Sequence, residues 1–163
     1  MIWQLRHRFD TDCAKLADLH YSRQKPGTPQ FVPPGRCVVL YAETDKGRAF
    51  WVSSFQKFAL HAWPGAWVCS AFRNEGAGLS STLIRSALAA TRAVWGDPPE
   101  IGCITFVNES KIKPKRDPGY CFIKAGFHKA GRTKENKLLA LQLGGEDFPG
   151  PAEPRMFQRR LDF

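Results

Sequence analysis

Apolar and polar residues follow two different periods along this chain, and each change of period marks an expected element. Short apolar runs bounded by glycine, proline or polar residues predict strands over residues 2–9, 37–42, 49–55, 66–72, 101–107, 127–133 and 138–143. Helical spacing predicts a helix that begins at Asp10, a longer one from Gly78 to Gly96, and a short one over 120–125. The apolar side of the first helix is expected to hold Cys13, Leu16, Ala17, Leu19 and His20. This order of elements predicts an α/β (α+β) fold, a mixed central sheet flanked by helices.

The 163 residues fit a single domain, with all of the expected elements inside residues 1–143. Residues 144–163 are rich in glycine and proline and carry a basic stretch at 155–160, so a C-terminal tail is expected there. Residues 26–35 are also rich in proline and glycine and are too many for a simple turn, which predicts a functional loop.

Composition excludes several classes of protein. With 43% hydrophobic and 12% aromatic residues, the chain has enough apolar surface for a core, which excludes general disorder. The longest apolar run, about 37–42, is far shorter than the roughly 20 residues of a membrane helix. Charged residues at 6–8 interrupt the stretch that a signal peptide would need to be apolar. We therefore expect the protein to act in the cytoplasm.

Positive charge is in clear excess, with 24 Lys and Arg against 15 Asp and Glu and a formal net charge of +9. The excess gathers at residues 6–8, 23–25, 111–116, 129–137 and 155–160. It favours an anionic partner such as nucleic acid, with solubility alone as the other explanation. The side chains expected to contact nucleic acid are Arg23, Lys25, Lys111, Lys113, Lys115 and Arg116.

The cysteines and histidines lack the spacing that is typical of a metal site. The five cysteines lie far apart with no C-x-x-C, and they fit buried thiols in a reducing compartment. The four histidines have no ligand spacing either, so no metal is expected.

The segment Arg73-x-x-Gly76-x-Gly78, between an expected strand and the long helix, gives the clearest indication of chemistry. Backbone amides at such a turn are unsatisfied and the helix dipole favours an anion. A pyrophosphate-bearing donor is one interpretation of the segment, and a plain tight turn is the other.

This segment and the order of the elements together resemble the GNAT acyltransferase superfamily. Two further landmarks agree, namely Asn108 after the fifth strand and Ala125-Gly126-Phe127 after the short helix. The resemblance covers about residues 2–143 and implies a GNAT-like fold. The residues that it places at the donor are Arg73, Gly76, Gly78, Ser80 and Ser81.

Three segments narrow the resemblance to one branch of that superfamily. They are His20-Tyr21-Ser22-x-x-x-Pro26, Arg73-Asn74-Glu75-Gly76, and Gly119-Tyr120-x-Phe122-x-x-Ala125-Gly126-Phe127-x-x-x-Gly131-x-Thr133. All three resemble segments of the Mom-type phage DNA modification enzymes. The resemblance implies transfer of a small acyl-type group to the exocyclic amine of adenine in DNA. Such a change would protect phage DNA from host restriction in the host cytoplasm.

The resemblance also implies a catalytic set, which comprises His20, Tyr21, Ser22, Arg73, Asn108 and Tyr120. His20 is expected to act as general base or to orient the acceptor, because its side chain titrates nearest neutrality. Tyr21 or Tyr120 would stack on a flipped base, and Arg73 would hold an anionic donor. A structural histidine and a core tyrosine are the ordinary alternatives for His20 and Tyr21.

Two positions depart from the pattern. Phe122 stands where typical members have a tyrosine that protonates the leaving thiolate, and phenylalanine has no proton to give. Asn108 stands where Mom-type enzymes have an aspartate. The donor therefore stays open between acetyl-CoA and another acyl donor. Two alternatives remain, an acetyl-CoA-dependent N-acetyltransferase of a small-molecule or protein amine and a nucleic-acid-binding protein without activity.

Overall fold

The computed structural model describes residues 1–20, 25–57, 61–111 and 117–157. Its strands are β1 (Gln4–Arg6), β2 (Arg36–Glu43), β3 (Arg48–Phe55), β4 (Trp67–Glu75), β5 (Cys103–Val107), β6 (His128–Arg132), β7 (Leu139–Leu143) and β8 (Arg155–Met156). Its α-helices are α1 (Thr11–Ala17), α2 (Ser80–Trp95) and α3 (Tyr120–Lys124), and two 3-10 turns are η1 (Glu109–Lys111) and η2 (Gly145–Asp147).

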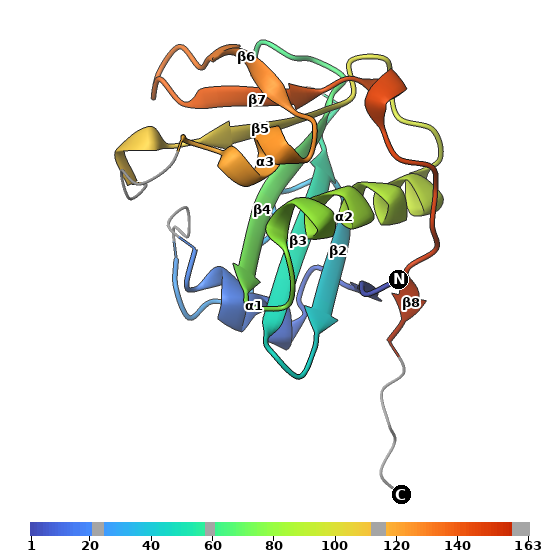
Figure 1. Ribbon diagram of the computed structural model, residues 1–163. Coiled ribbons are helices and arrows are strands. Elements are labelled where there is room, and N and C mark those ends of the chain that lie inside the picture. The colour runs from blue at the N-terminus through green and yellow to red at the C-terminus, as the bar shows by residue number, and fades with distance from the viewer. Residues whose placement is uncertain (21–24, 58–60, 112–116, 158–163) are drawn as a thin grey trace, which may run out of the picture.

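All eight strands form one sheet in the order β6-β7-β5-β4-β3-β2-β1-β8 (Figure 1). The β4–β5 and β1–β8 pairs are parallel and the other pairs are antiparallel, which confirms the expected mixed α/β sheet. Within the described ranges, each helix is too short or too polar to cross a bilayer.

The strand β4 is longer than the sequence pattern predicts. The apolar run ends at Phe72, but pairing with β3 continues through Arg73 and Asn74, opposite Phe50 and Ala49. The expected turn over 73–78 was therefore wrong in its first half. Successive side chains of a strand point to opposite faces of the sheet, and this part of β4 is only half-buried. Polar residues can therefore continue the strand beyond its apolar run.

The helices cover opposite faces of the sheet. Buried residues of α2, among them Leu83, Ile84 and Leu88, pack with Trp3 and Trp51 in the main core. On the other face, α1 buries an apolar side made of Cys13, Leu16 and Ala17 against β2 and β3. The expected stripe was wrong at its end, because Leu19 is 56% exposed beyond the end of the helix.

Residues 144–157 lie against the rest of the domain. The ring of Phe148 is buried 5.6 Å from that of Trp67, and the Ala152 amide donates to the Ala89 carbonyl. The chain then adds β8 to the edge of the sheet beside β1 (Figure 1). Residues 158–163, the end of the expected tail, are outside the described ranges.

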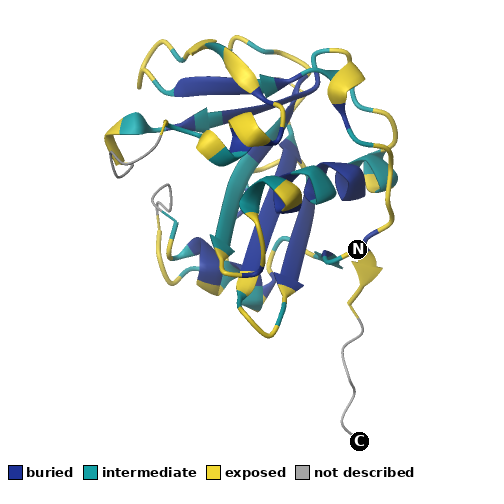
Figure 2. Ribbon diagram, viewed as in Figure 1, coloured by how far each residue is buried: buried dark blue, intermediate teal, exposed yellow. Residues whose placement is uncertain are grey.

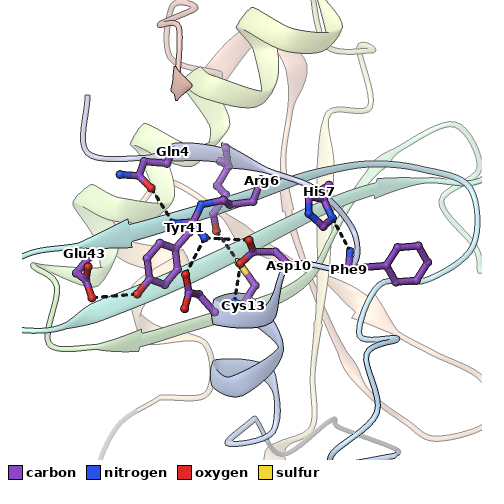
Figure 3. Close-up of polar contacts among 10 residues, drawn as sticks. Gln4, Arg6, His7, Phe9, Asp10, Cys13, Tyr41 and Glu43 are labelled. Atoms are coloured by element: carbon purple, nitrogen blue, oxygen red, sulfur yellow. Dashed lines mark hydrogen bonds and ion pairs between the residues drawn. The ribbon is translucent and has the colours of Figure 1, made fainter. Parts of the chain in front are cut away.

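A buried cluster around Arg6 joins β1 to the start of α1 (Figure 3). The Arg6 guanidinium donates to Asp10 and Asp12 at 2.9 Å each and lies 4.4 Å from the centre of the Tyr41 ring. Asp10 also accepts from the Cys13 amide at 2.9 Å and so caps α1. Burial by itself would raise the pKa of Asp10, but the hydrogen bond from Cys13 and the charge of Arg6 outweigh it and lower that pKa.

Replacing Arg6→Met should leave Asp10 buried without its cation. We expect the free energy of unfolding to fall by about 3 kcal/mol, because a broken buried ion pair leaves one charge uncompensated. Urea denaturation measures the loss. The double variant R6M/D10N should recover part of it, since asparagine keeps the cap without the charge. A double variant no more stable than R6M would show that charge compensation is not the cause.

Candidate functional site

The pairing between β4 and β5 ends partway along β4. Parallel pairing joins only Trp67 to Cys103, Val68 to Ile104, and Cys69 to Thr105. Beyond Cys69, β4 continues to Glu75 against β3 alone, and no strand among the described residues pairs with its other edge. Figure 2 shows the consequence, since β3 is buried along most of its length while β4 is largely half-buried. The sheet is therefore open at its middle.

A cavity of about 480 Å³ occupies this opening. Residues Cys69 to Phe72 of β4 form one wall, and residues Thr105 to Val107 of β5, followed by Asn108, form another. The remaining lining residues are His20, Ser110, Lys111, Phe122, Asn136 and Leu138. The cavity mixes apolar rings with a few polar side chains, the combination typical of a small-molecule site.

A second cavity of about 690 Å³ lies on the α1 side of the sheet. It is lined by Ala17, Phe50, Lys25 and the proline-rich loop 28–34 that the sequence predicts to be functional. Both cavities share three lining residues, His20, Ser70 and Ala71. A ligand in each cavity would therefore approach the other at these residues.

His20 lies at this junction and just beyond the end of α1, where its amide donates to the Ala17 carbonyl. Burial and, secondarily, the positive charge of Arg73 lower its pKa from the ordinary value of 6.5. The imidazole is therefore neutral at pH 7. A neutral imidazole accepts a proton, as a general base must.

Arg73 binds the end of α1. Its guanidinium donates to the Leu19 carbonyl at 2.8 Å and to the Glu75 carboxylate at 2.5 Å. These contacts bring Arg73 beside His20 and direct the guanidinium to Leu19 and Glu75. The sequence pattern implies an anion as the partner of Arg73, and these protein partners could not be foreseen from spacing.

The side chain of Asn74 stabilises the turn from β4 into α2. The amide nitrogen of Asn74 donates to the Gly78 carbonyl at 2.7 Å and to Ser80 Oγ at 2.9 Å, while its oxygen accepts from the Ala77 amide. Gly76 has φ of +86°, a conformation that favours glycine. The N-cap residue of α2 is Leu79, whose apolar side chain makes no cap hydrogen bond, and Ser81 in the first turn lies half-buried. The N-cap side chain thus leaves the amides of the first turn without an acceptor.

The other expected site residues divide between the cavities and the surface. Asn108 and Lys111 line the first cavity, and the side-chain oxygen Oδ1 of Asn108 accepts from the Ser110 amide and hydroxyl. Tyr120 is 41% exposed on α3, with its ring 5.6 Å from Lys124 Nζ, and lines neither cavity. The expected residues that lie outside the described ranges are Tyr21, Ser22, Arg23, Lys113, Lys115 and Arg116.

Phe122 forms part of an aromatic wall rather than a source of protons. It is buried on α3, with ring contacts to Trp51, Phe72 and Phe127 at 5.2–6.3 Å. Burial also raises the pKa of Cys69 far above that of an ordinary thiol, so this cavity residue stays protonated. A thiolate nucleophile is therefore not provided here.

The sequence did not predict five polar or thiol residues of the first cavity, namely Cys69, Ser70, Thr105, Ser110 and Asn136. One signal was present, because Ser70 interrupts the apolar run of its strand. Thr105 Oγ1 donates to the Cys69 carbonyl at 3.1 Å across the last paired rung of β4 and β5. In the described ranges, no three His, Cys, Asp or Glu side chains gather in a way that would hold a metal ion.

Comparison with family models, curated proteins and solved structures finds no match to the chain. The function therefore has to be argued from the residues of the chain itself.

The charge of Arg73 should be measurable at His20. In an NMR titration, His20 should have its midpoint below 6.5, and Arg73→Gln should move the midpoint upward because removal of a nearby cation favours the imidazolium. Arg92→Gln is the matched control, since Arg92 pairs with Asp97 at the far end of α2. An unchanged midpoint in R73Q would show that the charge of Arg73 does not affect the pKa of His20.

Proposed function

We propose that this protein is a GNAT-like transferase of Mom type, which transfers a small acyl-type group to the exocyclic amine of adenine in DNA. The observation that carries the proposal is the pair of cavities that share His20, Ser70 and Ala71. A transfer reaction needs two ligands whose reacting atoms meet, and holding both in one geometry supplies much of the rate. Both cavities fall within the size range of ligand sites.

The first cavity suits the donor. The unpaired edge of β4 beyond Cys69 offers backbone donors and acceptors to an extended ligand, as an exposed strand edge does to a peptide. The start of α2 follows that strand in the chain, outside the residues that line the cavity, and a helix N-terminus favours an anionic group. These features support a donor with both amide and acidic groups.

The second cavity suits the acceptor. Adenine must leave the base stack before its exocyclic amine can react, and a flipped base needs a pocket with apolar walls. Phe31, Val32 and Phe50 supply such walls on the α1 side of the sheet. His20 at the inner end is neutral at pH 7 and would take the proton that the amine loses as it forms the new bond.

Charge supports DNA as the source of the acceptor. Lys25 lines the second cavity and Lys111 the first, and both belong to basic segments of a chain with a net charge of +9. Cations around the mouth of a site position a nucleic acid through its phosphates without reading its sequence.

An acetyl-CoA-dependent N-acetyltransferase acting on a small amine is the second candidate. The uncapped helix start after Gly78 favours it, because a pyrophosphate would satisfy those amides. The two candidate functions use the same site for the donor and differ in the acceptor. Identifying the modified product therefore distinguishes them.

His20→Ala should abolish modification of DNA. In cells that express the protein, mass spectrometry of nucleosides should find a modified adenine, and H20A should lower its amount by about 10²-fold or more, as loss of a general base does. His128→Ala, which alters an exposed histidine on β6, is the control and should leave the amount unchanged. Unmodified adenine together with acetyl-CoA turnover on a small amine would favour the second candidate.

Lys111→Gln should weaken DNA binding in a salt-dependent way. A lysine that contacts phosphate adds about one unit to the slope of log affinity against log salt, so K111Q should reduce the slope by about that amount. Fluorescence anisotropy with a labelled duplex at several salt concentrations measures it. Lys46→Gln, in the β2–β3 turn, is the control. Equal slopes for K111Q and the wild type would remove Lys111 from the phosphate contacts.

A further inference from the structure

Ser70 occupies an irregular position in β4. Cys69 pairs with Ser53 of β3, and Ala71 pairs with the next residue back, Val52, so Ser70 is an extra residue with no partner on β3. Its pairing with β5 has also ended, since the last rung joins Cys69 to Thr105. A bulge of this kind redirects a side chain and is common beside active sites.

The hydroxyl of Ser70 is buried yet makes no hydrogen bond with any described residue. The buried hydroxyl of Ser53 on β3, by contrast, is satisfied by the Trp51 indole at 2.7 Å and by Thr91 at 2.9 Å. A buried polar atom without a partner is unfavourable and calls for an explanation. Because Ser70 lines both cavities, a ligand is the natural partner.

The surroundings indicate which ligand atom that partner is. Among the described residues that line the first cavity, Lys111 is the one charged side chain and His20 is neutral, so the cavity carries a positive charge. A positive site disfavours an ammonium group and favours an oxygen that carries partial negative charge. An oxygen acceptor needs a donor, and a serine hydroxyl rotates freely to supply one.

We propose that the Ser70 hydroxyl donates a hydrogen bond to the carbonyl oxygen of the group being transferred. This inference rests on the proposed function. The acceptor amine attacks the carbonyl carbon of an activated acyl donor, the new N–C bond forms, and the leaving group departs with the electron pair of the bond that breaks. The proton of the amine passes to His20. Ser70 keeps its own proton and stabilises the charge that develops on the oxygen.

The test compares Ser70→Ala, Ser70→Thr and a control, Ser54→Ala, which alters a buried serine of β3 that lines neither cavity. In cells, S70A should lower the amount of modified adenine by about 10²-fold, the usual effect of losing one such donor. S70T keeps a hydroxyl and should retain part of the yield, and S54A should retain all of it. The Tm of S70A should equal or exceed that of the wild type, because the hydroxyl makes no hydrogen bond with any described residue.

Two outcomes would overturn the role of Ser70 directly. One is a yield in S70A equal to that of the wild type. The other is a Tm several degrees lower with a proportional loss of yield, which would mean that the hydroxyl supports the fold instead.

A further measurement separates this inference from the proposed function. If the wild type yields no modified adenine, the proposed function fails, and calorimetric titration with acetyl-CoA and with CoA then decides the role of Ser70. Tighter binding of acetyl-CoA than of CoA, lost in S70A and kept in S54A, would support a hydrogen bond to the acyl oxygen. Equal binding of the two by the wild type, or binding of neither, would refute it.

Discussion

The separation of β4 from β5 is the constraint on which the rest of this molecule depends. Hydrogen bonds to β3 hold β4 in the sheet over almost its whole length, while those to β5 stop at Cys69. The strand β4 therefore packs in the core along one edge and lines the opening along the other. Toward one edge of the sheet, β5 continues the pairing with β7. On one face of the sheet, α1 packs against β2 and β3. The opening lies where β4 and β5 diverge, and both cavities border the same short stretch of β4.

A short helix positions the histidine of the site because it is fixed at both ends. At its start, Asp10 caps the helix and pairs with buried Arg6. At its end, Arg73 on β4 holds the Leu19 carbonyl, one residue before His20. A helix of seven residues would not be stable alone, so tertiary contacts have to fix it. The same arginine that fixes the chain also adjusts the proton affinity of His20, which couples the geometry of the site to its electrostatics.

Hydrophobic periodicity predicts most of the strands and helices, such as β2, β3 and α2, because the burial of each residue within its own element determines the pattern. Periodicity does not predict the register in which two strands pair. The end of β4–β5 pairing and the bulge at Ser70 depend on how distant strands meet, so neither the opening nor the hydroxyl could be located from the sequence. His20 and Arg73 were named from short segments, but their proximity follows from a contact across 54 residues. Tyr120 shows the opposite case, a motif residue that the fold leaves at the surface.

The aromatic wall restricts the chemistry that such a site performs. Phe122 and Phe72 line one side of the opening and supply no proton, and the neighbouring Cys69 thiol is a weak acid whose pKa burial raises further. In the proposed reaction, a leaving group would therefore depart as an anion, or take a proton from solvent or from His20 after His20 has accepted the proton of the amine. Acyl donors with a leaving group of low basicity meet that condition, and the positive charge of Lys111, which lines the cavity, would favour the departing anion. Because Phe122 offers no proton, the proposed reaction depends on a donor whose leaving group is itself a weak base.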